Sequence, residues 1–255
     1  MVKVASIDLG SNSTRLLIAD LTSGSLTTIY RKHQVTRMAD KLSESKIISN
    51  EAIKRVLKAL AGYFKIINKY NIENIQIVGT AALRDAKNSH EITQLIEKRF
   101  GIEVDIVSGE EEGLLTSVGV LNSLGNIEDF LIIDIGGRST EFIYDHDKKI
   151  VSKSLNLGVV SISELFFSEL PPSEGSLFLA KEYIESILFE SNIFDERMLV
   201  GVAGTFTSLA SIYLEQSQFD EKEIHLTELK NEDVFKINQE LLRLNEPQII
   251  TKYKG

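Results

Sequence analysis

Short apolar runs separated by polar turns open the chain. The runs at 2–9, 14–21 and 26–35 have the length and composition of β-strands, so they predict three consecutive strands. The turn LTSGSL between the last two carries serine and glycine, which favour tight chain reversals.

From residue 50 the apolar spacing becomes helical. In SNEAIKRVLKALAGYFKIINKY the apolar residues fall on one helical face, and Ser49 or Asn50 would cap the amino terminus. A strand NIQIVG, a helix SHEITQLIEKRFG closed by Gly101, and a strand VDIVSG are predicted next. A helix EEEGLLTSVGVLNSLG follows, with an acidic first turn that suits the helix dipole.

The same order then begins again. Strands are predicted at 130–135, 139–145 and 149–156, helices at 161–168 and 176–190, a strand at 198–204, and helices at 205–216 and 231–244. We interpret this as an internal duplication of an α/β unit. It predicts two similar domains, residues 1–125 and 126–255, with a cleft between them.

Each copy contains a polar bend at the end of a buried strand, in SIDLGSNSTRLLIAD and in LIIDIGGRSTEFIYD. Aligning the copies pairs Asp8 with Asp134, Gly10 with Gly136, and Ser13-Thr14 with Ser139-Thr140. Glycines allow close backbone approach, and successive N–H groups in such a turn attract anions. The bends therefore predict phosphate binding.

A carboxylate beside a phosphate would repel it, so Asp8 and Asp134 are predicted to bind a divalent cation or its waters. Hard oxygen ligands favour Mg²⁺. The alternative is two ordinary hairpin turns whose polar side chains bond the local backbone. The matching positions in both copies disfavour that alternative.

Composition narrows the classes of protein. The 255 residues include no cysteine, which excludes disulfides, thiolate metal sites and a cysteine nucleophile. A net charge of −9 argues against a general nucleic-acid binder. No apolar run approaches the roughly 20 residues that span a bilayer, and the amino terminus lacks a signal-peptide pattern. We therefore expect a cytoplasmic protein without a membrane partner.

Five segments in order, DLGSNSTRL, GTAALRDAKN, SGEEEG, DIGGRSTE and GVAGTFTSLA, resemble the signatures of the exopolyphosphatase/guanosine pentaphosphate phosphohydrolase family (Ppx/GppA), within the actin-like ATPase superfamily. The resemblance runs from Ile7 to about Leu244. It implies an α/β fold of two actin-like (ribonuclease H-like) domains with mixed sheets flanked by helices. It also implies hydrolysis of a terminal phosphoanhydride bond in polyphosphate or guanosine pentaphosphate, with Mg²⁺, and a possible homodimer.

The resemblance places the catalytic glutamate at Glu112 and makes Glu141 the next candidate, as an orienter of water or metal. The predicted phosphate-binding residues are Gly10, Ser11, Asn12, Ser13, Arg15, Arg84, Asn88, Gly136, Gly137, Arg138, Ser139, Thr140, Gly204 and Thr205. Several alternatives remain open. The acids at 110–112 also suit a helix amino terminus, Glu141 and Arg15 could be solvated strand residues, and the 204–205 turn could only pack.

The chain departs from the family pattern in two places. The third glycine of the second loop is Arg138, which would cost about 1–2 kcal/mol if that position were left-handed. Asn12 occupies the matching position of the first loop, and a guanidinium could add a phosphate donor. Family members also continue beyond TKYKG, so we expect a truncated second domain with exposed apolar surface.

These departures keep two other functions open. One is a non-catalytic sensor that binds polyphosphate or a guanosine alarmone. The other is an ATP-dependent kinase or ATPase on the same fold.

Overall fold

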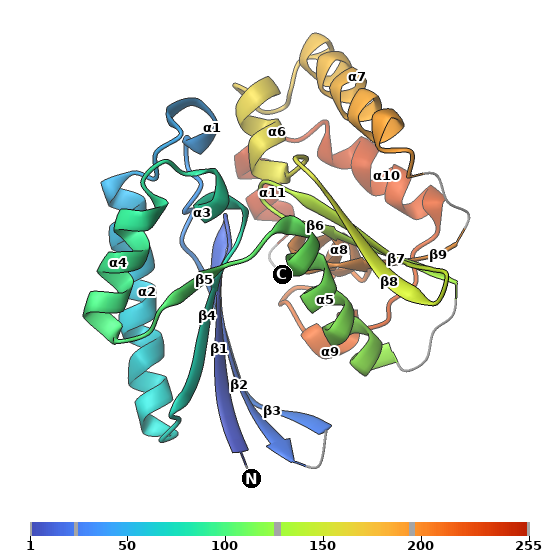
Figure 1. Ribbon diagram of the computed structural model, residues 1–255. Helices are drawn as coiled ribbons and strands as arrows, with labels where there is room; N and C mark the ends of the chain where they lie inside the picture. The colour runs from blue at the N-terminus through green and yellow to red at the C-terminus, as the bar shows by residue number, and fades with distance from the viewer. Residues whose placement is uncertain (1, 23–24, 125–128, 194–196, 254–255) are drawn as a thin grey trace.

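The computed structural model describes residues 2–22, 25–124, 129–193 and 197–253, and it contains two mixed β-sheets flanked by helices (Figure 1). The first sheet has the order β3-β2-β1-β4-β5. Its strands are β1 (Val2–Leu9), β2 (Ser13–Thr22), β3 (Ser25–Val35), β4 (Asn74–Gly79) and β5 (Val104–Ile106). β1 pairs antiparallel with β2 and parallel with β4.

The second sheet, which has four strands, repeats the arrangement of β3-β2-β1-β4. Its order is β8-β7-β6-β9, with β6 (Phe130–Ile135) antiparallel to β7 (Thr140–His146) and parallel to β9 (Met198–Val202). β8 (Lys149–Leu155) pairs antiparallel with β7. The predicted fold class, α/β with two mixed sheets flanked by helices, is confirmed.

The longer helices also follow the sequence pattern. They are α2 (Asn50–Lys69), α4 (Ser89–Phe100), α5 (Gly109–Leu124), α6 (Val159–Phe166), α7 (Glu174–Ser191), α8 (Ala203–Tyr213) and α10 (Asn231–Leu241). The side chain of Ser49 accepts a hydrogen bond from the N–H of Ala52, which makes Ser49 the cap of α2. Gly101 ends α4 in the left-handed conformation, with φ of 74°.

The sequence pattern did not predict four short helices: α1 (Leu42–Ser45), α3 (Ala81–Asp85), α9 (Glu221–Ile224) and α11 (Glu246–Lys252). Three of them span only one turn or slightly more, too short for a helical repeat of apolar residues to stand out. Strand β5 is also shorter than the predicted VDIVSG strand.

Helix α5 packs on β7 and β8 of the second sheet, although it lies before residue 125 in the chain (Figure 1). Its close contact depends on two glycines four residues apart. A Cβ on Gly109 would overlap Ser154, and one on Gly113 would overlap Ser152. The domain boundary near residue 125 stays a prediction, and α5 is the element that passes from the first sheet to the second.

The parts of the chain built around the first and second sheets, called the first and second domains below, differ in their cores. An extensive buried cluster lies between the first sheet and helices α2 and α4, whereas the second cluster has Phe130, Ile132 and Ile143 as its buried members. Large apolar side chains are exposed in the second domain, among them Phe178, with 62% of its surface exposed, and Phe235, with 63%. In the part of the chain that the structure describes, no helix is long and apolar enough to cross a membrane.

Candidate active site

The two polar bends have the same backbone geometry. The N–H of Gly10 donates to the carbonyl of Ser13 at 3.0 Å, and the N–H of Gly136 donates to the carbonyl of Ser139 at 3.0 Å. The strands after the bends also match, because Asp8 lies opposite Arg15 in the β1–β2 pair and Asp134 lies opposite Glu141 in the β6–β7 pair. The structure thus supports the pairing of the two copies that the sequence predicted.

The two loops contact each other. A Cβ on Gly137 would lie 3.0 Å from Cβ of Ser11 and 3.5 Å from the amide nitrogen of Asn12. Within the described residues, the backbone N–H groups of Ser11, Asn12, Gly137 and Arg138 have no acceptor. Free N–H groups from both domains therefore gather at one place, an arrangement that attracts anions.

Asp8 and Asp134 lie near each other beside these loops. Burial raises the pKa of Asp8 to about 6; Arg15 lowers it, and Glu112 and Asp134 raise it further. Burial likewise raises the pKa of Asp134 to about 6. Arg15 lowers this pKa, Glu112 raises it, and a hydrogen bond from Thr116 lowers it. These mutual influences require the carboxylates to share one region, as expected for a site assembled from both domains.

Glu112 makes contacts of a different kind from those of Glu111, the acid before it in the helix. Glu111 accepts a hydrogen bond from the N–H of Ser108 at 2.8 Å, and Ser108 Oγ accepts from the N–H of Glu111, which forms a capping box. Glu112 instead binds Arg84, with Nη1 to Oε2 at 2.8 Å. The acidic run therefore contains one capping residue and one residue directed at the site.

Arg84 lies in the short helix α3, which follows β4. Its Nη1 donates both to Glu112 and to the carbonyl of Val107, at 2.9 Å. Among the described residues no partner occupies its Nε or Nη2, which leaves these donors for a substrate oxygen.

Glu141 lies on β7 and is buried, with 1% of its surface exposed, so it does not face solvent. Its Oε1 accepts a hydrogen bond from Ser154 Oγ at 2.8 Å. Burial raises its pKa to about 7; Glu112 adds to the rise, hydrogen bonds from Ser154 and Ser139 reduce it, and Asp134 adds slightly. This carboxyl therefore titrates near neutral pH.

The residues at the site meet some of the requirements of a divalent-cation site. Asp8 Oδ1 is buried and has no hydrogen-bond partner, an arrangement that a cation would relieve. No group of three or more His, Asp or Glu side chains in the described residues is arranged to hold a metal. A cation here would thus take one or two carboxylates and complete its shell with water and substrate oxygens, which is the habit of Mg²⁺.

Two predicted phosphate ligands are engaged elsewhere. The Asn88 amide binds the backbone of Ile48 twice, at 3.0 Å each. Arg138 points across to the first domain and binds Asp85 and Ser43. Neither Arg138 nor Asn12 has a positive φ, so the arginine causes no backbone strain in the second loop.

The remaining predicted residues divide into two groups. Arg15 Nη1 lies 3.9 Å from Asp8 Oδ2, at the site. Thr205 Oγ1 donates to the carbonyl of Ile135 at 3.0 Å, a packing contact beneath the second loop. Gly204 is exposed and a Cβ there would meet no atom, so its backbone makes no close approach.

Sequence reasoning missed the residues that orient the carboxylates. Ser154 lies opposite Glu141 in the β7–β8 hairpin, whose closing pair is His146 and Lys149. The predicted strand ends at 145 and 149 would have paired Glu141 with Lys153 instead. Thr116, whose Oγ1 lies 3.5 Å from Asp134 Oδ2, comes from α5. No sequence signal places that helix against the second sheet.

Known proteins of several kinds are similar to this chain. A bifunctional 3-dehydroquinate synthase/phosphatase of Fusobacterium nucleatum is 34% identical over 245 residues, which are 90% of this chain and 37% of that protein. Exopolyphosphatase 2 of Mycobacterium tuberculosis is 28% identical over 97% of this chain and 82% of its own length. A guanosine-5'-triphosphate,3'-diphosphate pyrophosphatase of Vibrio cholerae is 33% identical over 89% of this chain and 46% of its length.

The fold agrees with solved structures. The Aquifex aeolicus member of the Ppx/GppA family superposes with a TM-score of 0.81 at 28% identity, over 99% of this chain and 83% of that one. A crystal structure of an exopolyphosphatase-like protein superposes with a TM-score of 0.90 at 25% identity, over 100% of this chain and 82% of that one. The Ppx/GppA phosphatase family matches residues 17–251. The chain belongs to the Ppx/GppA phosphatase family.

Proposed function

We propose that this protein releases the terminal phosphate of inorganic polyphosphate or of guanosine pentaphosphate by attack of an oriented water. One observation carries the proposal. Free backbone N–H groups from two matching loops gather beside four carboxylates, Asp8, Glu112, Asp134 and Glu141, with Arg15 and Arg84 among them. Relatives named for polyphosphate and for guanosine pentaphosphate chemistry support the choice of substrates.

Phosphoryl transfer of this kind depends on positioning and charge neutralisation more than on covalent chemistry. The loop N–H groups would bind the terminal phosphate, and Arg84 would add Nε and Nη2 as donors. Glu112 would hold the attacking water, since its carboxylate is already fixed by Arg84. Glu141, held by Ser154, would accept or return a proton near neutral pH.

Asp8 and Asp134 are the residues that would hold Mg²⁺, which when bound neutralises phosphate charge and polarises the bond to be broken. Without a cation, their carboxylates would repel the substrate. The unpartnered Oδ1 of Asp8 supports this assignment.

The test is phosphate release from polyphosphate and from guanosine pentaphosphate, with Mg²⁺ and with a chelator. We expect release that needs Mg²⁺ and falls by about 100-fold or more in Glu112→Gln, as for the loss of a general base. Glu110→Gln, an exposed acid in the same helical turn, is the matched control and should retain activity. Release that Glu112→Gln leaves intact would refute the role of Glu112.

The same assay addresses the two other functions. Tight substrate binding without turnover would identify a sensor, and ATP turnover that needs a second substrate would identify a kinase. The sensor hypothesis has lost one of its supports, because Arg138 does not distort the second loop.

A further inference from the structure

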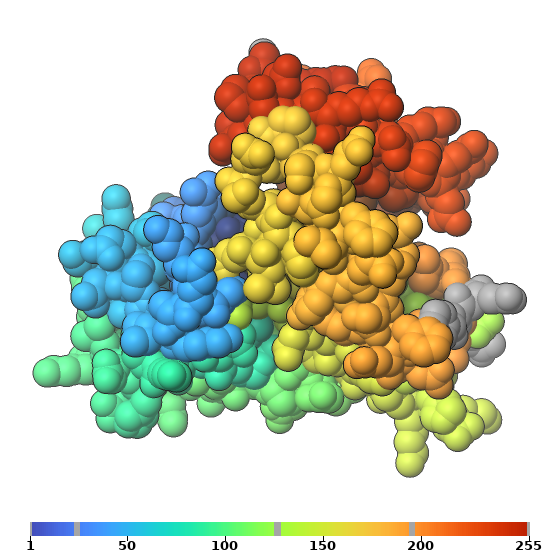
Figure 2. Space-filling model, turned by 90° about the horizontal axis from the view of Figure 1, so that it is seen from above, coloured from blue at the N-terminus to red at the C-terminus, as the bar shows by residue number. Residues whose placement is uncertain are grey.

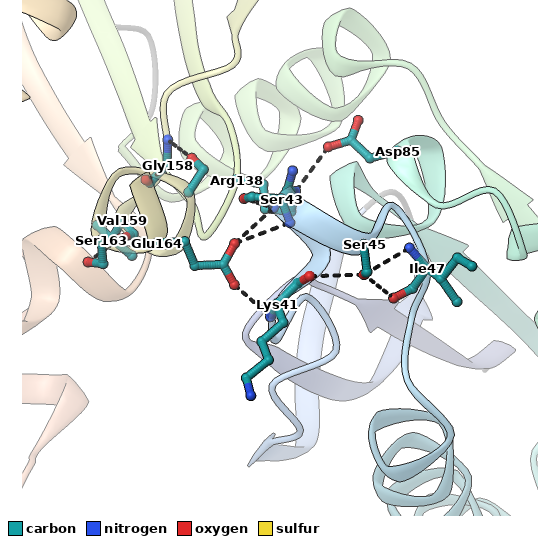
Figure 3. A network of polar contacts seen from close by, with 11 residues as sticks. Lys41, Ser43, Ser45, Ile47, Asp85, Arg138, Gly158, Val159, Ser163 and Glu164 are labelled. Carbon is teal, nitrogen blue, oxygen red and sulfur yellow. Dashed lines mark hydrogen bonds and ion pairs between the residues drawn. The ribbon is translucent and has the colours of Figure 1, made fainter. Parts of the chain in front are cut away.

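Arg138 is the residue at which this chain departs from the three-glycine loop pattern, and its side chain leaves the phosphate loop. It extends from the second domain to the first, where Nε donates to Asp85 Oδ2 at 2.9 Å and Nη1 donates to Ser43 Oγ at 2.9 Å (Figure 3). Only 6% of the side chain is exposed. A buried guanidinium requires such partners, because an unpaired one would be strongly unfavourable.

Glu164 of the second domain provides further contacts with Arg138 and with the first domain. It lies on α6 of the second domain, and its Oε2 is 3.7 Å from Arg138 Nη1. Its carboxylate also accepts hydrogen bonds from the backbone N–H groups of Lys41, at 2.7 Å, and Ser43, at 3.3 Å (Figure 3). These amides begin helix α1, and Figure 2 shows the α6 segment seated against this part of the first domain.

We propose that Arg138, Asp85, Ser43 and Glu164 form an interdomain latch that positions the catalytic groups of the two domains. Its catalytic effect rests on the proposed function, whereas its effect on domain arrangement does not. Arg138 and Glu164 are positioning residues in this proposal, since their contacts are with protein groups of the other domain.

The short helix α3 links the latch to the site. Arg84 and Asp85 are consecutive residues of this helix. The first binds Glu112, and the second binds Arg138. A shift of Asp85 would therefore move Arg84 relative to Glu112. Because Arg138 belongs to the second phosphate loop, the same contact fixes that loop against α3.

Another interdomain ion pair provides a matched control. Arg31 of β3 lies 3.3 Å from Glu221 of α9, but both side chains are more than half exposed. Exposed pairs contribute little stability. Arg31→Gln thus removes an arginine between the same two domains without opening a buried contact.

The chain has no cysteine, so two introduced cysteines can be labelled without a background. Lys58→Cys on α2 and Glu182→Cys on α7 replace exposed residues of the two domains. Pulsed electron paramagnetic resonance then measures the distribution of the interdomain distance. We expect a narrow distribution for the parent chain and for Arg31→Gln, and a broader one for Arg138→Gln.

In phosphate release, Arg138→Gln should lower kcat by about 10- to 100-fold, the effect expected when catalytic groups are displaced by about 1 Å. Arg138→Lys should restore only part of the loss, because an ammonium cannot span Asp85 and Ser43 as a guanidinium does. If Arg138→Gln does not fold, Glu164→Gln tests the same contact by removing the facing carboxylate charge.

The latch is overturned if Arg138→Gln, or Glu164→Gln in its place, keeps the narrow distance distribution, or if Arg31→Gln broadens it equally. An unchanged kcat with a broadened distribution would overturn the positioning role. If the parent chain releases no phosphate from either substrate, the proposed function fails while the distance measurement still decides the latch.

Discussion

Replacing Glu141 by glutamine should stabilise the protein while impairing its activity. In the absence of a cation, the pKa of Glu141 rises from the ordinary 4.5 to about 7, mainly because the carboxyl is buried. Each pKa unit corresponds to about 1.4 kcal/mol. At pH 8 the folded state therefore loses about 3 kcal/mol by keeping this group ionised, compared with the unfolded chain.

The sign follows from the direction of the pKa change. Because the folded pKa lies above the unfolded one, the folded state holds its proton to higher pH, and stability is lost as pH rises through about 7. At pH 5 the carboxyl is protonated in the folded state, and the loss is below about 1 kcal/mol. Asp8 and Asp134, with pKa values of about 6, change stability in the same direction.

The assay is urea unfolding at pH 5 and pH 8 in the presence of a chelator. Glutamine keeps an oxygen for the hydrogen bond from Ser154 and removes the charge. Glu141→Gln should therefore raise the free energy of unfolding by about 3 kcal/mol at pH 8 and by much less at pH 5. Glu110→Gln is an exposed control, expected to stay within about 0.5 kcal/mol at both. An equal gain in the free energy of unfolding at the two pH values would show that the charge of buried Glu141 does not destabilise the folded state.

Three other predictions concern the backbone, the packing of α5 and the site. Ala203 has φ of 65°, so Ala203→Gly should raise the free energy of unfolding by about 1 kcal/mol in urea denaturation. Gly113→Ala would overlap Ser152 and should lower it by about 1–3 kcal/mol, partly restored by Ser152→Gly. Arg84→Gln removes the partner of Glu112 and should lower kcat/KM for phosphate release by about 100-fold.

Each of these has a result that would contradict it. Loss of stability in Ala203→Gly would mean that the left-handed backbone at residue 203 does not destabilise the folded state. An unaffected Gly113→Ala would show that α5 does not approach β8 closely. Full activity in Arg84→Gln, with Glu112→Gln inactive, would separate the two residues and remove the arginine from the mechanism.

The local pattern of the chain contained most of the fold. Apolar periodicity located the strands and longer helices within a few residues, because a strand or helix buries a regularly spaced face. The sequence also predicted the duplication, since matching bends recur in the same order. The left-handed end of α4 at Gly101 and the cap at Ser49 followed from residue chemistry alone.

The sequence did not predict correctly which side chains reach the site. The sequence grouped Asn88 and Arg138 with the phosphate ligands, yet one binds Ile48 and the other binds across the domains. Both residues sit in the expected segments. Their partners come from distant parts of the chain, and only tertiary packing decides which atoms are near.

Residue order alone was enough to predict the kind of protein: two copies of an α/β unit, each with a polar glycine-bearing bend after a buried strand, and the family signatures on those bends. Three features depend on the folded molecule: Glu141 is buried and has a raised pKa, α5 crosses to the second sheet, and Arg138 joins the domains. Burial, charge coupling and close contact depend on neighbours far apart in the chain, whereas periodicity and capping depend on residues within a few positions.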